Sequence, residues 1–177
     1  MLNRSVFSYF LTETESAGDL AFLASSVKRS FGKYTLYTDG NTPFSSASVE
    51  ERACAIFGLA VNVVSGEEEN LAHKIAETCD SIADVLAYER DLGGKYVIFY
   101  RDREQYYLLG DATCSIPIFY NQGDAVACSC NDRAIADTKG YCVDDAHLKI
   151  RKSGEISQAM PSDITVWRPK AAMCLTM

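Results

Sequence analysis

Cys114 is the residue of this chain whose surroundings most suggest chemistry. It lies between two apolar runs, close in sequence to the carboxylate of Asp111 and the hydroxyl of Thr113. A cysteine becomes a nucleophile when a neighbouring group lowers the pKa of its thiol, and histidine is the usual base. The two histidines, His73 and His147, are both far from Cys114 in the sequence. A catalytic Cys114 is therefore the enzymatic hypothesis for this chain.

The other cysteines do not form a redox or metal motif. Cys128 and Cys130 are separated by one residue, which is too few for a C-x-x-C motif, and a zinc site needs two more ligands. An odd number of cysteines at irregular spacing favours buried, reduced thiols over a disulfide framework. We therefore predict no metal and no cofactor. The seven cysteines are Cys54, Cys79, Cys114, Cys128, Cys130, Cys142 and Cys174.

Length and composition set the broad class of the protein. With 177 residues, of which 47% are hydrophobic, the chain can bury one sizeable core, and we expect a single domain over residues 1–177. The formal net charge is −7 and the basic residues are scattered, which argues against nucleic-acid binding. No apolar stretch approaches the ~20 residues that span a bilayer. We expect a cytoplasmic protein that binds neither nucleic acid nor membrane, with its oligomeric state left open.

The first part of the chain is expected to form two strands separated by a helix or a long loop. Residues 5–11 are β-prone, and residues 33–38 alternate in the manner of a strand before a turn signal at 39–41. Between the two strands, residues 19–31 carry apolar side chains at helix-like spacing.

The middle of the chain combines an apolar run with an amphipathic helix. The run covers residues 53–64, and its strand-like half is 59–64. The acidic residues 67–69 are expected to begin the helix, because carboxylates in the first turn favour the helix dipole. A break is expected near Asp80 and Ser81. The apolar face of the helix is predicted to consist of Leu71, Ile75, Cys79, Ile82 and Leu86.

Three β-rich segments then follow one another across short polar breaks, at 92–100, 106–113 and 116–120. This pattern is typical of an antiparallel meander. The remaining expected elements are a strand at 125–129, a short helix at 131–138 capped by Asn131 or Asp132, and a late strand at 162–167. Early strands, central helices and late strands together predict an α+β architecture.

A second pattern runs from the strand-like segment 94–100 into the turn that follows it. Its residues are Asp111, Thr113, Pro117, Ile118, Phe119 and Tyr120. In this order they resemble the closing hairpins of the N-terminal domain of asparagine synthetase-like proteins, where the turn reads D-x-x-G-x-x-P-[LVI]-[FY]-Y. Cys114 stands where that turn has its glycine. The resemblance extends over residues 92–167 and is weaker over the helix before them.

The resemblance implies an N-terminal-nucleophile (Ntn) hydrolase fold, in which two antiparallel sheets are stacked between helical layers (αββα). In that family the domain hydrolyses glutamine, and the ammonia passes to an ATP-using domain that amidates an adenylated carboxylate. The family-like turn then supplies the candidate site residues Asp111, Thr113, Pro117 and Tyr120.

The catalytic groups of that family are missing from this chain. Glutamine hydrolysis there requires a cysteine directly after the initiator methionine, because its freed amine is the base for its own thiol. Here the second residue is Leu2 and the first cysteine is Cys54. An N-G-E segment, which stabilises the oxyanion, is absent, and the turn at 39–41 is a poor substitute. An S-G-G-x-D-S pyrophosphate loop is absent as well.

We therefore expect a non-catalytic relative of the asparagine synthetase and glutamine amidotransferase domains, which serves as a structural or partner-binding module for a synthetase-like protein or domain. The enzymatic alternative is an amidohydrolase or amidotransferase that uses the relocated cysteine Cys114. A third interpretation is that the chain is a fragment, since residues 171–177 form an unusual ending.

Overall fold

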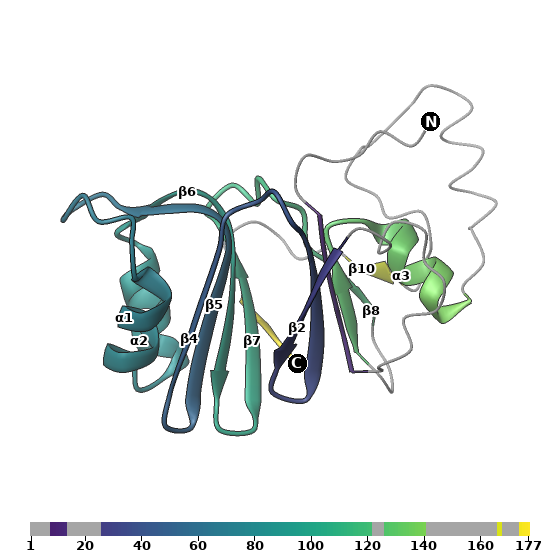
Figure 1. Cartoon of the computed structure of the whole chain (residues 1–177), viewed down its shortest axis with the longest axis horizontal. Helices are drawn as coiled ribbons and strands as arrows, with labels where there is room; N and C mark the ends of the chain where they lie inside the picture. Colours follow the sequence, from purple (N-terminus) through teal and green to yellow (C-terminus); the bar gives the residue numbers. More distant parts are fainter. Residues whose placement is uncertain (1–7, 14–25, 122–125, 141–165, 168–173) are drawn as a thin grey trace. The chain divides into compact units, whose positions relative to one another are not determined.

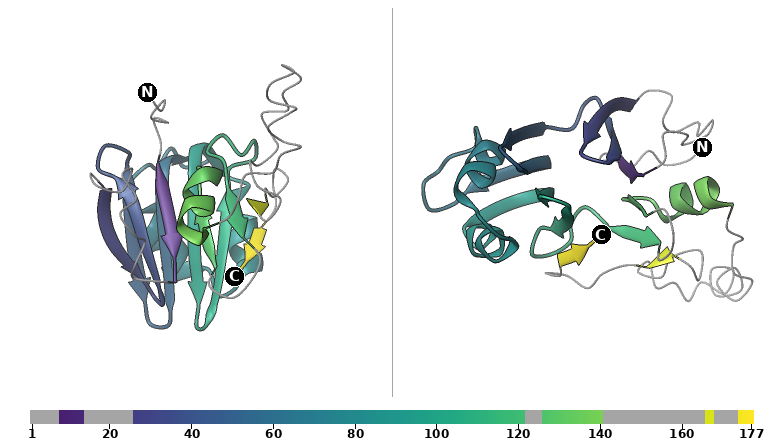
Figure 2. Two further views of the ribbon diagram at one scale, coloured as in Figure 1. Left: turned by 90° about the vertical axis from the view of Figure 1, so that its right-hand side faces the viewer. Right: turned by 90° about the horizontal axis from the view of Figure 1, so that it is seen from below.

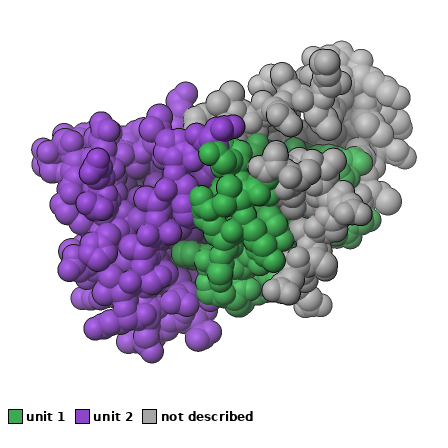
Figure 3. Space-filling view, in the orientation of Figure 1, with its two compact units in different colours: residues 1–40, 117–169 green, residues 41–116, 170–177 purple. Residues whose placement is uncertain are grey.

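The computed structural model describes residues 8–13, 26–121, 126–140, 166–167 and 174–177 (Figure 1). These residues form two antiparallel sheets and three helices, which confirms the predicted α+β class. The chain divides into two compact units with one sheet in each (Figure 3). Unit 1 consists of residues 1–40 and 117–169, and unit 2 consists of residues 41–116 and 170–177. The single domain over residues 1–177 and the stacking of the two sheets stay predictions.

Unit 1 contains a six-stranded sheet and helix α3 (Asp132–Lys139), which packs against β8 and β9. In spatial order its strands are β10 (Val166–Trp167), β8 (Phe119–Asn121), β9 (Ala127–Ser129), β1 (Tyr9–Thr12), β3 (Tyr34–Asp39) and β2 (Ser26–Phe31). Helix α3 is capped as predicted, because the side chain of Asn131 accepts a hydrogen bond of 3.0 Å from the N–H of Arg133. The strands predicted at 33–38 and 125–129 correspond to β3 and β9.

The helix predicted at 19–31 is wrong over residues 26–31, which form strand β2; residues 19–25 lie outside the described ranges. Strand β2 pairs with β3 along six residues, and only Gly32 and Lys33 separate the two strands. Gly32 has a φ of 60°, as the first position of a type II′ hairpin turn requires. The tight turn and the pairing with β3 therefore override the helix-like spacing of the apolar residues.

Unit 2 contains a five-stranded sheet and two helices. In spatial order its strands are β11 (Cys174–Thr176), β7 (Gln105–Gly110), β6 (Leu92–Asp102), β5 (Arg52–Asn62) and β4 (Phe44–Val49). Strands β5 and β6 pair along eleven residues, so the apolar run expected to be a strand only at 59–64 is a strand from Arg52. Helices α1 (Leu71–Thr78) and α2 (Ile82–Glu89) cover one face of this sheet (Figure 2).

The helical segment of unit 2 differs from its prediction at the start but not at the break. Helix α1 begins at Leu71 rather than at 67–69, because Asn70 has a left-handed backbone (φ 61°) and Glu67 forms a β-bridge with Asn62. The predicted break is confirmed: α1 ends at Thr78, and the side chain of Ser81 caps α2.

The core of unit 2 lies between the helices and the sheet. Leu71 and Ile75 of α1 pack with Ile56 and Ile98 of the sheet. The break changes which side of α2 faces the sheet, so that Val85 is buried whereas Leu86 is 38% exposed. The predicted apolar face is therefore confirmed in α1 and shifted in α2.

The expected three-stranded meander is wrong in its third strand. Strands β6 and β7 form a hairpin in the sheet of unit 2, but β8 belongs to the sheet of unit 1. The backbone after β7 turns at Asp111 instead of pairing again, and Pro117 has no N–H to donate to a strand. In the described part of the chain no helix is long and apolar enough to cross a membrane.

Candidate functional site

The segment that directly follows β7 is organised around the carboxylate of Asp111. Its oxygens accept hydrogen bonds from the backbone N–H and hydroxyl of Thr113, at 3.0 and 2.7 Å. They also accept hydrogen bonds from the N–H and hydroxyl of Ser115, both at 3.1 Å. The backbone carbonyl of Asp111 accepts a further bond of 2.8 Å from the N–H of Cys114. One side chain thus holds together a turn of five residues, which we call the Asp111 turn (residues 111–115).

The hydrogen bonds of this turn favour the ionised form of Asp111. Burial acts to raise the pKa of this carboxyl, but the hydrogen bonds from Thr113 and Ser115 outweigh it, so the pKa lies below its ordinary value. A general acid needs a carboxyl that retains its proton near neutral pH. The geometry therefore makes Asp111 a structural anchor of the turn rather than a proton donor.

Cys114 lies in the Asp111 turn with a left-handed backbone conformation, at a φ of 48°. This is the conformation in which glycine is normally found, because a Cβ atom is strained there. Only 7% of Cys114 is exposed. The residue that the sequence places at a glycine position thus has the backbone of a glycine, with its side chain buried.

The predicted site residues are divided between the two units. Asp111, Thr113 and Cys114 come together in the Asp111 turn of unit 2. Pro117 and Tyr120 belong to unit 1, where the carbonyl oxygen of Pro117 accepts a hydrogen bond of 3.2 Å from the hydroxyl of Tyr9. Tyr120 lies on β8, in register with Trp167 and Cys128.

Cys54, Cys79 and Cys128 are buried thiols, while the Sγ of Cys130 accepts a hydrogen bond of 3.4 Å from the N–H of Tyr9. Burial raises the pKa of the thiols of Cys54, Cys79 and Cys128, and Cys54 and Cys79 belong to the core of unit 2. A raised pKa keeps a thiol protonated, whereas the thiolate is the nucleophile and the metal ligand. Within the described ranges, no three His, Cys, Asp or Glu side chains gather as metal ligands do. His73 is exposed on α1, 3.8 Å from Glu77, and His147 lies outside the described residues.

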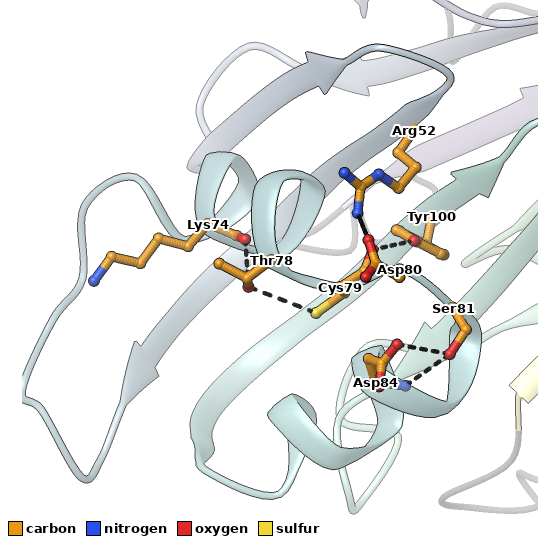
Figure 4. A network of polar contacts seen from close by, with 8 residues as sticks. All are labelled: Arg52, Lys74, Thr78, Cys79, Asp80, Ser81, Asp84 and Tyr100. Carbon is orange, nitrogen blue, oxygen red and sulfur yellow. Dashed lines mark hydrogen bonds and ion pairs between the residues drawn. The ribbon is translucent and has the colours of Figure 1, made fainter.

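A polar network fixes the break between α1 and α2 to the sheet (Figure 4). The backbone carbonyl of Cys79 accepts hydrogen bonds from the guanidinium of Arg52 at 3.0 Å and from the hydroxyl of Tyr100 at 2.8 Å. Arg52 also forms an ion pair with Asp80. Two strands thus hold one turn of backbone, and the sequence analysis missed this network because its partners are 21 to 28 residues apart.

A cavity of about 260 Å³ lies beside β4, the edge strand of the sheet of unit 2. Residues of β4 and β5 form one side of it, and the segment before α1 forms the other. Gly58 on this side has a φ of 110°, and a Cβ atom there would lie 2.2 Å from the carbonyl oxygen of Lys95 on β6, so a larger residue does not fit. The lining residues are Pro43, Phe44, Ser45, Ile56, Gly58, Leu59, Ala60, Glu68, Glu69 and Leu71.

The chain was compared with models of known protein families and with curated proteins. A scan against models of known protein families finds no match for the chain. A search of curated proteins finds none with significant similarity.

Proposed function

We propose that this chain is a non-catalytic domain of the asparagine synthetase and glutamine amidotransferase type, with the stacked sheets of an Ntn hydrolase. Two antiparallel sheets with three helices among the described residues are compatible with that fold. The Asp111 turn carries the proposal. Glycine, the fourth residue of the D-x-x-G pattern, is the residue that best tolerates a left-handed backbone, and Cys114 has that backbone, with a φ of 48°.

The placement of the thiols supports a chain that does not hydrolyse glutamine. The first cysteine of the sequence is Cys54. Burial raises the pKa of Cys54, Cys79 and Cys128, and Cys114 is itself buried. A nucleophilic cysteine needs both a populated thiolate and access to its substrate.

The remaining role is that of a structural or partner-binding module for a synthetase-type domain. In the family that the sequence resembles, this domain passes ammonia to an ATP-using synthetase domain. Contact with such a synthetase-type partner is the role that we propose for this chain. The buried reduced thiols of Cys54 and Cys79 support a reducing compartment, such as the cytoplasm.

Glutamine hydrolysis by the purified chain tests the non-catalytic part of the proposal. Glutamate release is measured for the wild type and for Cys114→Ala, with an active glutaminase domain as the positive control. We expect both samples to release glutamate no faster than buffer alone. Release by the wild type that is lost in Cys114→Ala overturns the proposal and establishes a relocated nucleophile.

Labelling with iodoacetamide tests the thiol of Cys114 independently of the choice of substrate. Ordinary thiols have a pKa near 8.5, so their labelling is slow below a pH of ~7. We expect slow labelling of the native chain at all sites, resolved by peptide mass spectrometry. Rapid and selective labelling of Cys114 would favour the amidohydrolase or amidotransferase alternative.

The module role is tested with a synthetase-type domain that lacks its own glutaminase domain. The two purified proteins are mixed and analysed by size-exclusion chromatography with light scattering. We expect a complex whose mass equals the sum of the two. Separate elution at concentrations well above those in a cell contradicts the module role.

A further inference from the structure

From the cavity and the edge strand beside it, we infer that unit 2 binds an extended peptide segment of a partner protein, which adds a strand to β4. One apolar side chain of the peptide fills the cavity, and a neighbouring lysine or arginine pairs with Glu68 and Glu69. This inference is independent of the function proposed above, because it uses none of the family-like residues.

The backbone of β4 is arranged to accept another strand. The N–H of Gly58 donates a hydrogen bond of 2.9 Å to the carbonyl of Pro43, so these two residues form a hydrogen-bonded pair of the antiparallel ladder. Hydrogen-bonded and non-hydrogen-bonded pairs alternate along such a ladder. Ser46 and Ser48 therefore direct their backbone N–H and C=O groups away from β5. Both residues are exposed, and β4 has no strand on its other side in the described sheet.

The size of the cavity suits one side chain better than a cofactor. Its volume of about 260 Å³ is below the ≈300–1,000 Å³ of typical ligand pockets. An apolar cavity of about 150 Å³ is known to admit benzene, so a leucine or phenylalanine side chain fits. Leu59 is 60% exposed and lines the cavity, which extends the apolar surface to its rim. Recognition by strand addition needs main-chain hydrogen bonds and a pocket for a side chain. The edge of β4 supplies the hydrogen bonds, and the cavity supplies the pocket.

The charge of the rim selects a basic partner. Glu68 and Glu69 are both exposed, and neither has an ion pair in the part of the chain that the structure describes, whereas the nearby Glu67 pairs with Lys74. Two carboxylates beside an apolar cavity attract a peptide in which an apolar residue adjoins a lysine or an arginine, and repel an acidic one.

A second copy of this chain is a poorer occupant of the same edge. An antiparallel pair of two β4 strands would place the turn at Glu50 and Glu51 of one copy near the start of β4 in the other. That is the end where Glu68 and Glu69 line the cavity. Glu51 is paired with Arg103. The like charges that meet at both ends of the pair, and that disfavour this dimer, are therefore those of Glu50 against Glu68 and Glu69.

Binding is tested with three fluorescent octapeptides and the full-length chain, by fluorescence anisotropy. The first alternates threonine and valine around a central leucine and lysine, the second has glutamate in place of the lysine, and the third has a central proline that prevents a strand. We expect saturable binding of the first peptide alone, weakened by salt because the rim contact is ionic. Equal binding of the three peptides, or binding of none at millimolar protein, overturns the inference.

Variants of β4 and of the rim separate the two contacts. Ser46→Pro removes an N–H that faces away from β5, so it leaves the pairing with β5 intact and should abolish binding; Ser46→Thr is the matched control. Glu69→Lys should weaken binding of the lysine peptide about tenfold, while the exposed Glu104→Lys should not. Circular dichroism confirms that each variant is folded. Unchanged peptide binding by Ser46→Pro contradicts the inference. A wild-type chain that dimerises through β4, and whose dimer rather than its peptide binding is lost in Ser46→Pro, contradicts it as well.

Discussion

The hydroxyl of Tyr100 donates a hydrogen bond of 2.8 Å to the backbone carbonyl of Cys79. This contact joins the middle of the sheet of unit 2 to the one place where its helical segment is interrupted. A helix leaves its last carbonyl groups without partners inside the helix, and a buried carbonyl without any partner is costly. Tyr100 and Arg52 both donate to the carbonyl of Cys79, the C-cap residue of α1.

Removal of the hydroxyl in Tyr100→Phe should lower the free energy of unfolding by about 1–2 kcal/mol, because a buried hydrogen bond is lost while the ring remains. The ring contact with Tyr107, at a centroid distance of 6.2 Å, is retained by phenylalanine. Urea unfolding of the wild type and the variant measures the difference. Tyr88→Phe, on α2, is the control and should change the stability by less than about 0.5 kcal/mol. Equal effects of the two substitutions contradict the assigned role.

The strand pairs of unit 2 also contain a position that only glycine can occupy. Gly94 on β6 has a φ of 126°, and a Cβ atom there would lie 2.1 Å from the carbonyl oxygen of Leu59. Gly94→Ala should therefore destabilise the chain by about 3 kcal/mol or more, since strain and overlap add. Thermal unfolding monitored by circular dichroism measures this effect.

Substitutions at two other glycines distinguish backbone strain from steric overlap as causes of the destabilisation by Gly94→Ala. Gly66 has a φ of 73° with no atom within 4 Å of an added Cβ, so Gly66→Ala should cost about 1 kcal/mol from the backbone alone. Gly40→Ala meets only Val27 at an ordinary 3.7 Å and should leave the stability unchanged or slightly higher. If Gly94→Ala lowers the free energy of unfolding no more than Gly66→Ala does, the contact between the added Cβ and the Leu59 carbonyl is relieved by small shifts of the backbone.

The sequence predicted those features that depend on local signals. The break between α1 and α2, the cap at Asn131 and the β6–β7 hairpin follow from residues close to one another in the chain. The strand β2 and the separate sheet of β8 could not be predicted in this way, because pairing with distant strands decides them.

The same distinction holds for the candidate sites. The proximity of Asp111, Thr113 and Cys114 was visible in the sequence because they are adjacent. The left-handed backbone of Cys114 was implied only by its glycine-like position. The cavity beside β4 was missed, since it combines residues of two strands with an acidic segment that the sequence assigned to the first turn of a helix.

The low pKa of Asp111 predicts a loss of stability in acid. Burial opposes ionisation of this carboxyl, but the hydrogen bonds from Thr113 and Ser115 lower the pKa below the ordinary value near 3.9. A pKa that is lower in the folded chain contributes stability above the unfolded value, and this stability is lost as the pH falls through the folded value. The stability difference between the wild type and Asp111→Asn should therefore be largest at neutral pH and shrink below pH ~4.

Chemical unfolding at a series of pH values measures that difference. Asp91→Asn removes the same charge from an exposed position and serves as the control. Its difference from the wild type should vary less between neutral and acidic pH than that of Asp111→Asn. A difference at Asp111 that stays constant down to pH ~2 would mean that the hydrogen bonds of the turn do not depend on ionisation.

The backbone of Cys114 allows the turn to be tested with two substitutions that both remove the thiol. At a φ of 48° a Cβ atom costs about 1–2 kcal/mol, and glycine loses part of that advantage through its greater freedom in the unfolded chain. Cys114→Gly should therefore be more stable than Cys114→Ala by about 0.5–1 kcal/mol in urea unfolding. The ordinary preference in a chain runs the other way, since alanine is normally the more stable of the two. A more stable alanine variant would remove the argument that this turn has the backbone of a D-x-x-G turn, and with it the main structural support for the proposed family.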